Sequence, residues 1–294
     1  MTTARYILLD VFAERAFEGN QLAIFPDCEI DDLAMQRVAR ELNLAETVFL
    51  TRGGTDAAAS LRIFTPGREV AFAGHPTIGT AIAMVEELQW IDPGTNAFVL
   101  RERVGDIAIS IERAAVTTAW LQTPETRFGS MISRDVAAAM LRLESDTVRD
   151  DVTPQVAGAG STFLYVPLRS KVDVDRAEID EPALRTYVGT KDIVGVYLFA
   201  QGDDGAYTRM FAPMSGIAED PATGSAAGPL YALLARHHAL PRREHFVNEQ
   251  GVLMGRRSVI QIRCVWDGQH LTRVDVGGNA VIVGRGELNL PGTA

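Results

Sequence analysis

The chain has 294 residues, which is enough for about two domains of roughly 150 residues each, and 47% of its residues are hydrophobic and 22% charged. This is the composition of a folded globular protein, so it excludes disorder as the working state. The formal net charge of −10, with no segregated basic patch, argues against nucleic acid as a partner.

The N-terminus and the cysteines indicate the compartment. Asp10 interrupts the short apolar run at the N-terminus and no small-residue cleavage site follows, so we expect a first strand there rather than a signal peptide. No apolar run approaches the roughly 18 residues that a membrane span needs. Cys28 and Cys264 lie in unrelated contexts without a CxxC pair, which indicates neither a disulfide framework nor a zinc site. We therefore expect a cytoplasmic protein that binds no membrane.

The most informative feature along the chain is a repeat of half its own length. In the first copy, the alternating apolar segment RIFTPGREV runs into a turn, and a proline then opens a small-residue helix. With an offset of 147 positions, the second copy matches Arg62, Phe64, Pro66 and Val70 with Arg209, Phe211, Pro213 and Ile217. With an offset of 145, it matches Pro76, Gly79, Thr80 and Ala81 with Pro221, Gly224, Ser225 and Ala226.

The two repeated helices are predicted from residue 76 to about residue 88 and from residue 221 to about residue 237. Proline suits a first helical turn, so the preceding residues, His75 and Asp220, would be the N-caps. Both helices consist largely of small and apolar residues. Strands can therefore approach them closely, and both are expected to be buried.

Each half is predicted to be an α/β unit in which a barrel-like mixed sheet surrounds one central helix. After each helix the strand pattern returns, in IAISIE (107–112) and in VIQIR (259–263), and the polar, turn-rich QTPETRFGS marks a boundary. We predict an N-terminal domain over residues 1–118, joined by a C-terminal strand at about 278–294, and a second domain over residues 119–277.

The two helix starts predict a binding site. If a two-fold relates the halves, both helix N-termini point into the cleft between the domains, where their unpaired N–H groups suit a substrate that bears a carboxylate. Gly74 and Gly224 would let the backbone approach this substrate closely. The polar side chains at these helix starts are His75, Asp220 and Ser225.

Glu46 is the remaining titratable candidate. It lies between an apolar helix end, ELNLA, and an apolar strand, TVFL, where desolvation would raise its pKa toward the range useful for proton transfer. Each candidate also has a simpler interpretation: a strand-edge acid for Glu46, an interior histidine for His75, a helix cap for Asp220 and a packing residue for Ser225.

Common cofactor and hydrolase motifs do not occur in the chain. It lacks GxGxxG after a strand, the phosphate-binding GxxxxGKS/T, the nucleophile motif GxSxG and the zinc motif HExxH. We therefore expect no cofactor and no metal.

Five motifs resemble those of the PhzF-like proteins, a family named for a phenazine-biosynthesis isomerase. These are FEGNQLAIF, AETVFL, FTPGREVAFAGHPTIGTA, EDPATGSAAG and EQGVLMGRRS, and the match runs from near residue 7 to near residue 288. The resemblance implies two similar α/β domains of the diaminopimelate-epimerase-like fold, cofactor-free proton-shift chemistry in the interdomain cleft, and a homodimer. In the phenazine enzyme, the substrate is trans-2,3-dihydro-3-hydroxyanthranilate.

The resemblance also implies roles for individual residues. By motif, Glu46 matches the family's catalytic carboxylate, His75, Asp220 and Ser225 match its other active-site groups, and Gly74 matches its close-approach glycine. Epimerase relatives carry a cysteine at each helix start instead, so racemisation by two thiols is not expected here.

Two positions depart from the family pattern. Gln21 stands where the family often has a proline after GN, and Arg257 stands where it often has a proline in a GRPS turn. Neither is expected to touch the proposed acid/base residues.

Three functions follow as hypotheses. The leading one is a cofactor-independent isomerase that moves a proton within a small carboxylate-bearing substrate. The first alternative is an epimerase or dehydratase that acts on an amino or hydroxy acid. The second is a non-catalytic module that binds a metabolite or a protein on an inherited scaffold.

Overall fold

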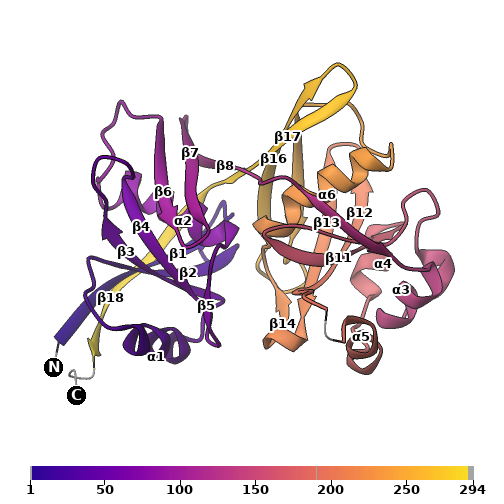
Figure 1. Ribbon diagram of the computed structural model, residues 1–294, viewed down its shortest axis with the longest axis horizontal. Helices are drawn as coiled ribbons and strands as arrows, with labels where there is room; N and C mark the ends of the chain where they lie inside the picture. The colour runs from indigo at the N-terminus through magenta and orange to yellow at the C-terminus, as the bar shows by residue number, and fades with distance from the viewer. Residues whose placement is uncertain (1, 190, 291–294) are drawn as a thin grey trace. The chain divides into compact units, whose positions relative to one another are not determined.

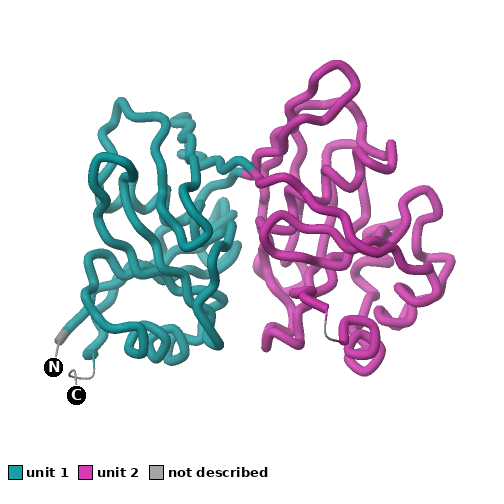
Figure 2. The backbone as a smooth tube through the Cα atoms, in the orientation of Figure 1, with its two compact units in different colours: residues 1–122, 277–294 teal, residues 123–276 magenta. Residues whose placement is uncertain are grey.

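The computed structural model describes residues 2–189 and 191–290, and the chain divides into two compact units (Figures 1 and 2). Unit 1 comprises residues 1–122 and 277–294, and unit 2 comprises residues 123–276. The sequence predicts these boundaries after residues 118 and 277. Among the described residues, no helix is long and apolar enough to cross a membrane.

Unit 1 surrounds helix α2 with strands. Its elements are β1 (Thr2–Val11), β2 (Asn20–Pro26), α1 (Asp32–Leu42), β3 (Glu46–Arg52), β4 (Ala59–Phe64), β5 (Glu69–Val70), α2 (Gly74–Glu86), β6 (Ala97–Glu102), β7 (Gly105–Arg113), β8 (Thr117–Gln122) and β18 (Ala280–Leu290). β1 pairs antiparallel with β18 and β2, and β2 pairs parallel with β3. β4 pairs antiparallel with β3 and parallel with β6, and β7 lies antiparallel between β6 and β8.

Helix α2 is buried because its side chains are small. Every residue over 74–84 is buried, and the helix contacts β1, β2, β3, β8 and β18. A Cβ on Gly79 would lie 2.6 Å from side-chain atoms of Leu22 and of Val11, so these strands could not approach a larger residue as closely. The predicted burial of this helix is confirmed.

Unit 2 repeats this arrangement around helix α6 (Figure 1). Its elements are β9 (Arg127–Met131), α3 (Arg134–Met140), the 3-10 helix η1 (Ser145–Thr147), β10 (Gln155–Ala159), β11 (Ser161–Leu168), α4 (Lys171–Arg176), α5 (Glu181–Val188), β12 (Gly195–Gly202), β13 (Gly205–Ala212), the 3-10 helix η2 (Pro213–Ser215), β14 (Ile217–Asp220), α6 (Gly224–Arg236), β15 (His245–Gln250), β16 (Ser258–Asp267) and β17 (His270–Gly278). α6 contacts β10, β11 and β16. A Cβ on Gly228 would lie 2.3 Å from Thr123 Oγ1.

The strand pairing confirms the internal repeat. In unit 1, β2 runs parallel to β3, β3 antiparallel to β4, β4 parallel to β6, and β6 antiparallel to β7. In unit 2, β11 runs parallel to β12, β12 antiparallel to β13, β13 parallel to β15, and β15 antiparallel to β16. The two units therefore share one order of pairing.

The repeated arginines share two contacts in both units. Arg62 donates from Nε and a terminal nitrogen to Glu69, at 2.9 Å each, and Arg209 donates in the same forked way to Glu219 at 2.8 and 2.9 Å. Each guanidinium also lies over the ring two residues later in its strand, that of Phe64 or Phe211. The offset of 147 for this part of the repeat is confirmed.

The offset predicted for the helix starts is wrong. Ile63 pairs with Val70, seven residues later, whereas Met210, the counterpart of Ile63, pairs with Asp220, ten residues later. The second connection is therefore three residues longer, and the offset becomes 150 instead of 145. Asp220, and not Ile217, corresponds to Val70.

The predicted N-caps are wrong as well. α2 begins at Gly74 with Ala73 as its N-cap, which makes His75 the second helical residue. α6 begins at Gly224 with Thr223 as its N-cap, and Asp220 instead ends strand β14. With the offset of 150, the counterpart of His75 is therefore Ser225, which is the second residue of α6.

Candidate active site

Unit 1 brings Glu46 and His75 together. Glu46 is the first residue of β3, and His75 lies in the first turn of α2. Glu46 Oε2 and His75 Nε2 are 3.3 Å apart. The side chain of Glu46 is 16% exposed and that of His75 is 5% exposed, so the carboxyl group is the more accessible of the two.

Parallel pairing of two strands sets the position of Glu46. β2 and β3 run in the same direction, and Leu22 of β2 pairs with Glu46. The start of β2 therefore lies at the same end of the sheet as the start of β3. Asn20, the first residue of β2, is buried there, and its Nδ2 lies 3.4 Å from His75 Nδ1.

His75 is uncharged near neutral pH. Burial lowers its pKa to about 3, although a hydrogen bond from the ring to the backbone of Gln21 acts in the opposite direction. Among the described residues Nε2 has no hydrogen-bond partner of acceptable geometry, so the bond to Gln21 belongs to Nδ1. The contact with Glu46 is thus one between a neutral ring and a carboxyl group.

The expectation that Gln21 does not touch the acid/base residues is wrong, because its main chain bonds His75. The contact uses the carbonyl group, which a proline at this position would also offer. Arg257, the other departure from the family pattern, lies at a different place: it donates from Nε to Glu249 Oε1 at 2.8 Å.

Unit 2 places Asp220 in a buried polar network at the start of α6. Thr223 Oγ1 donates to Asp220 Oδ2 at 2.5 Å. Gln250, the last residue of β15, donates to the Asp220 carbonyl at 2.8 Å and to Thr223 Oγ1 at 2.9 Å. Gln250 Oε1 accepts from the backbone N–H of Thr223 at 3.2 Å. The three side chains thus fix the turn that leads into the helix.

The network continues inward through tyrosines. Tyr197 donates to Gln250 Oε1 at 3.2 Å, and Asn248 Nδ2 donates to the Tyr197 hydroxyl at 3.4 Å. Tyr231 donates to Asn248 Oδ1 at 2.7 Å. Burial raises the pKa of both tyrosines well above the ordinary value, so both act as neutral hydrogen-bond groups.

The predicted residues therefore fall into two sets, one in each unit. Glu46, His75 and Gly74 belong to unit 1. Asp220, Gly224 and the half-buried Ser225 belong to unit 2, within six residues of one another. In the part of the chain that the structure describes, the N-cap side chain of neither helix bonds its first turn.

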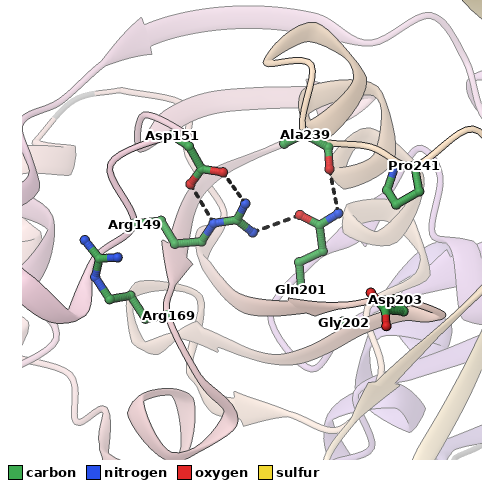
Figure 3. A pocket seen from close by; sticks show the side chains of 8 residues that line it. All are labelled: Arg149, Asp151, Arg169, Gln201, Gly202, Asp203, Ala239 and Pro241. Atoms are coloured by element: carbon green, nitrogen blue, oxygen red, sulfur yellow. Dashed lines mark hydrogen bonds and ion pairs between the residues drawn. The ribbon is translucent and has the colours of Figure 1, made fainter.

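A pocket of about 390 Å³ in unit 2 contains none of these residues (Figure 3). Arg149, Asp151, Arg169, Gln201, Gly202, Asp203, Ala239 and Pro241 line it. Arg149 binds Asp151 through two hydrogen bonds and donates to Gln201, which in turn donates to the Ala239 carbonyl. Its polar groups thus connect two loops of the unit to strand β12.

Sequence reasoning missed several residues of both sets. Asn20 and Gln250 stand inside the recognised motifs FEGNQLAIF and EQGVLMGRRS, so their place in these motifs was the available signal. Thr223 is part of EDPATGSAAG, where it was overlooked because the helix was predicted to begin earlier. Across residues 2–189 and 191–290, no three His, Cys, Asp or Glu side chains lie where they could hold a metal ion.

Known proteins that are similar to this chain identify its family. The family model described as phenazine biosynthesis-like protein, PhzC-PhzF, matches residues 9–286. The chain belongs to the PhzC-PhzF family. Trans-2,3-dihydro-3-hydroxyanthranilate isomerase from Pseudomonas aeruginosa is 35% identical to it over 291 residues, which cover 97% of this chain and 99% of the relative.

Solved structures agree with this membership. A predicted epimerase from Pseudomonas aeruginosa is 33% identical, covers 97% of this chain and 99% of its own, and superposes with a TM-score of 0.83. A PhzF-family protein from Bacillus anthracis has a TM-score of 0.88 at 21% identity, over 99% of this chain and 100% of its own, which shows a shared fold. The predicted diaminopimelate-epimerase-like α/β fold is confirmed. This PhzC-PhzF member is an enzyme of the isomerase and epimerase class.

Proposed function

We propose that the chain is a cofactor-independent isomerase that moves a proton within a small carboxylate-bearing substrate, with Glu46 as general acid and base. The contact between Glu46 and His75 is the observation that carries this proposal. The relative with 35% identity is named for the isomerisation of trans-2,3-dihydro-3-hydroxyanthranilate, so this compound is the first substrate to test.

The accessible carboxyl group of Glu46 suits a reaction in which one group acts first as a base and then as an acid. A proton shift requires a group that removes a proton from one carbon and returns it to another position. Glu46 is the reachable member of the pair, since the side chain of His75 is 5% exposed. We therefore assign the proton transfer to Glu46 and the orientation of its carboxyl group to His75.

A neutral imidazole can serve both protonation states of Glu46. The Nδ1 atom of His75 lies near an N–H donor, the Asn20 amide, and also near an acceptor, the Gln21 carbonyl. It can therefore be satisfied with or without a proton. If the carboxyl group of Glu46 turned toward Nε2, Nε2–H would donate to the carboxylate in one tautomer, and Nε2 would accept from the protonated acid in the other.

We propose that unit 2 completes the site in the cleft between the domains. Asp220 would steer the transferred proton, and Ser225 would hydrogen-bond the substrate. The starts of α2 and α6, at Gly74 and Gly224, would hold the substrate carboxylate with their N–H groups. We further propose that the enzyme is a cytoplasmic homodimer that acts without membrane or nucleic acid.

The cysteines do not favour two-thiol epimerisation. Cys264 is buried in β16, where burial raises the pKa of its thiol to about 12, and Cys28 follows β2. Neither lies at a helix start. An epimerase would then need Asp220 or His75 as its second group, and solvent exchange at one stereocentre without rearrangement would identify that reaction.

The test is the substitution Glu46→Gln. Loss of an acid/base group should lower turnover of trans-2,3-dihydro-3-hydroxyanthranilate by about 100- to 10,000-fold, as measured by the disappearance of substrate in proton NMR. The matched control is Glu287→Gln, which changes an exposed carboxylate on β18. Wild-type turnover by a folded Glu46→Gln variant would overturn the assignment.

A further inference from the structure

A second carboxyl group lies at the start of α2, and the mechanism above does not use it. Glu102 is the last residue of β6 and is 5% exposed. Its Oε1 lies 2.5 Å from Oγ1 of Thr77, which belongs to the first turns of α2. Its Oε2 is buried and has no hydrogen-bond partner among the described residues.

The contacts of Thr77 indicate where the protons lie. Thr77 Oγ1 is 2.8 Å from the Ala73 carbonyl and 2.5 Å from Glu102 Oε1. A hydroxyl group has one proton, and a carbonyl only accepts. Both contacts are hydrogen bonds if Glu102 is protonated, donates to Thr77, and Thr77 donates to Ala73. An ionised Glu102 would compete with Ala73 for the one proton and would leave a charged, buried Oε2 without a partner.

The repeat identifies the counterpart of Glu102 independently. With the offset of 147, Ser60 of β4 corresponds to Tyr207 of β13. Ser60 pairs with Arg101 of β6, and Tyr207 pairs with Glu249 of β15. The next residue of each strand, which is the last of β6 and of β15, therefore occupies the same place in its unit.

That counterpart is Gln250, which has the shape of a protonated glutamate and carries no charge. It donates to Thr223 Oγ1 at the N-cap of α6, whereas Glu102 contacts the hydroxyl of Thr77, the fourth residue of α2. One copy of the repeat thus places a permanently neutral donor where the other places a carboxyl group.

We infer that Glu102 is a positioning residue whose protonated form is the one that supports turnover. Its acid proton is donated to Thr77 Oγ1, whose own proton goes to the Ala73 carbonyl. This chain of hydrogen bonds fixes the first turn of α2, which presents His75 to Glu46. The protonation state of Glu102 does not depend on the proposed function, whereas its effect on turnover does.

Several of the charged groups around Glu102 are bound to partners other than Glu102. The titratable groups on the elements beside Glu102 are Arg62 of β4, Glu69 of β5, His75 and Glu86 of α2, Arg101 of β6, Arg103, and Asp106, Glu112 and Arg113 of β7. Arg101 forms an ion pair with Asp106 at 2.8 Å, and Arg62 and Arg103 form ion pairs with Glu69. Glu86 accepts from Thr117, and Arg113 donates to Asn96.

Burial is the main influence on the titration of Glu102. It raises the pKa of this carboxyl to about 7, while the hydrogen bond with Thr77 acts in the opposite direction. Above that pH the carboxylate would draw the Thr77 proton away from Ala73. The first turn of α2 would then lose one of its bonds, and turnover should fall as the pH rises.

The test follows the Glu102 carboxyl carbon by NMR in the wild-type protein labelled with carbon-13 glutamate, assigned by its absence in Glu102→Gln. The expected result is a titration near pH 7. A titration near the ordinary value of 4.5 would overturn the inference. This measurement needs no substrate, and if Glu102→Gln does not fold, the signal that moves in Thr77→Ser, which keeps the hydroxyl, gives the assignment.

Activity gives the second readout. Glu102→Gln should keep its low-pH kcat up to about pH 9, whereas wild type should lose about tenfold or more over the same interval, with little change in KM. Glu287→Gln should follow wild type. An identical fall of kcat in wild type and Glu102→Gln would overturn the positioning role. Failure of the proposed substrate would leave the carbon-13 titration as the deciding result.

Discussion

The starts of α2 and α6 share one backbone arrangement and carry different chemistry. His75 corresponds to Ser225, and Glu102 corresponds to Gln250. The first copy combines an accessible carboxyl group with two buried titratable groups, whereas the second surrounds Asp220 with neutral hydroxyl and amide groups. The duplicated backbone arrangement therefore sets the positions of these groups, and each copy adds its own side-chain chemistry.

The largest expected difference in stability lies between the repeated arginines. The side chain of Arg209 is 11% exposed, and it also donates to the carbonyls of Val174, Asp175 and Ala177, whereas that of Arg62 is 34% exposed. Arg209→Met should cost about 3–5 kcal/mol because it leaves buried partners unpaired. Arg62→Met should cost about 1 kcal/mol. Urea unfolding measures both, and equal losses would contradict the comparison.

Glu102 ends β6 and Gln250 ends β15. Exchanging these two side-chain types should move a pH dependence of the unfolding free energy from unit 1 to unit 2. Glu102 has a pKa of about 7 when folded and an ordinary value of 4.5, so its proton stabilises the fold below pH 4.5, and this stability is lost as the pH rises through 7. The loss is roughly 3 kcal/mol. Glu102→Gln should remove it, and Gln250→Glu should add a similar loss in unit 2. The unfolding free energy of each variant, compared with wild type at both ends of this interval, measures the effect.

The small-residue helices should resist enlargement. Gly79→Ala places a methyl group 2.6 Å from side chains of β1 and β2, and this overpacking should cost about 1–3 kcal/mol. Gly94→Ala is the control, because nothing lies within 4 Å of its added Cβ. Denaturant midpoints should separate the two variants. An unchanged midpoint for Gly79→Ala would mean that the strands can move away from the helix.

The smallest expected effect is an absence of titration. Because burial lowers the pKa of His75 to about 3, its imidazole signals in proton–nitrogen NMR should stay those of a neutral ring from pH 8 to about pH 4. His75→Gln identifies the signals. A change centred near the ordinary value of 6.5 would contradict the neutral contact with Glu46.

Much of the fold could be predicted from the sequence. Arg62 and Arg209 made the repeat visible because each stands two residues before a phenylalanine, on a strand with an alternating pattern. The small residues of both helices indicated burial. Glu46 and His75 were chosen separately, and the structure shows that they are in contact.

The exact helix starts could not be predicted, because three more residues separate the paired Met210 and Asp220 than separate the equivalent Ile63 and Val70. A proline suits a first helical turn in either copy, so Pro221 gave a false start for α6. Glu102 escaped notice because it belongs to the polar run RERVGD, and its burial depends on the neighbouring helix. Local sequence patterns indicate which residues are neighbours along the chain, but they do not indicate contacts between distant segments.

The most direct test of the central claim is proton NMR of trans-2,3-dihydro-3-hydroxyanthranilate in D₂O, with wild-type protein and with Glu46→Gln. We predict rearrangement by wild type, with solvent deuterium at the carbon that receives the proton, and neither change with the variant. Rearrangement by Glu46→Gln at the wild-type rate would contradict the assignment of the proton transfer to Glu46.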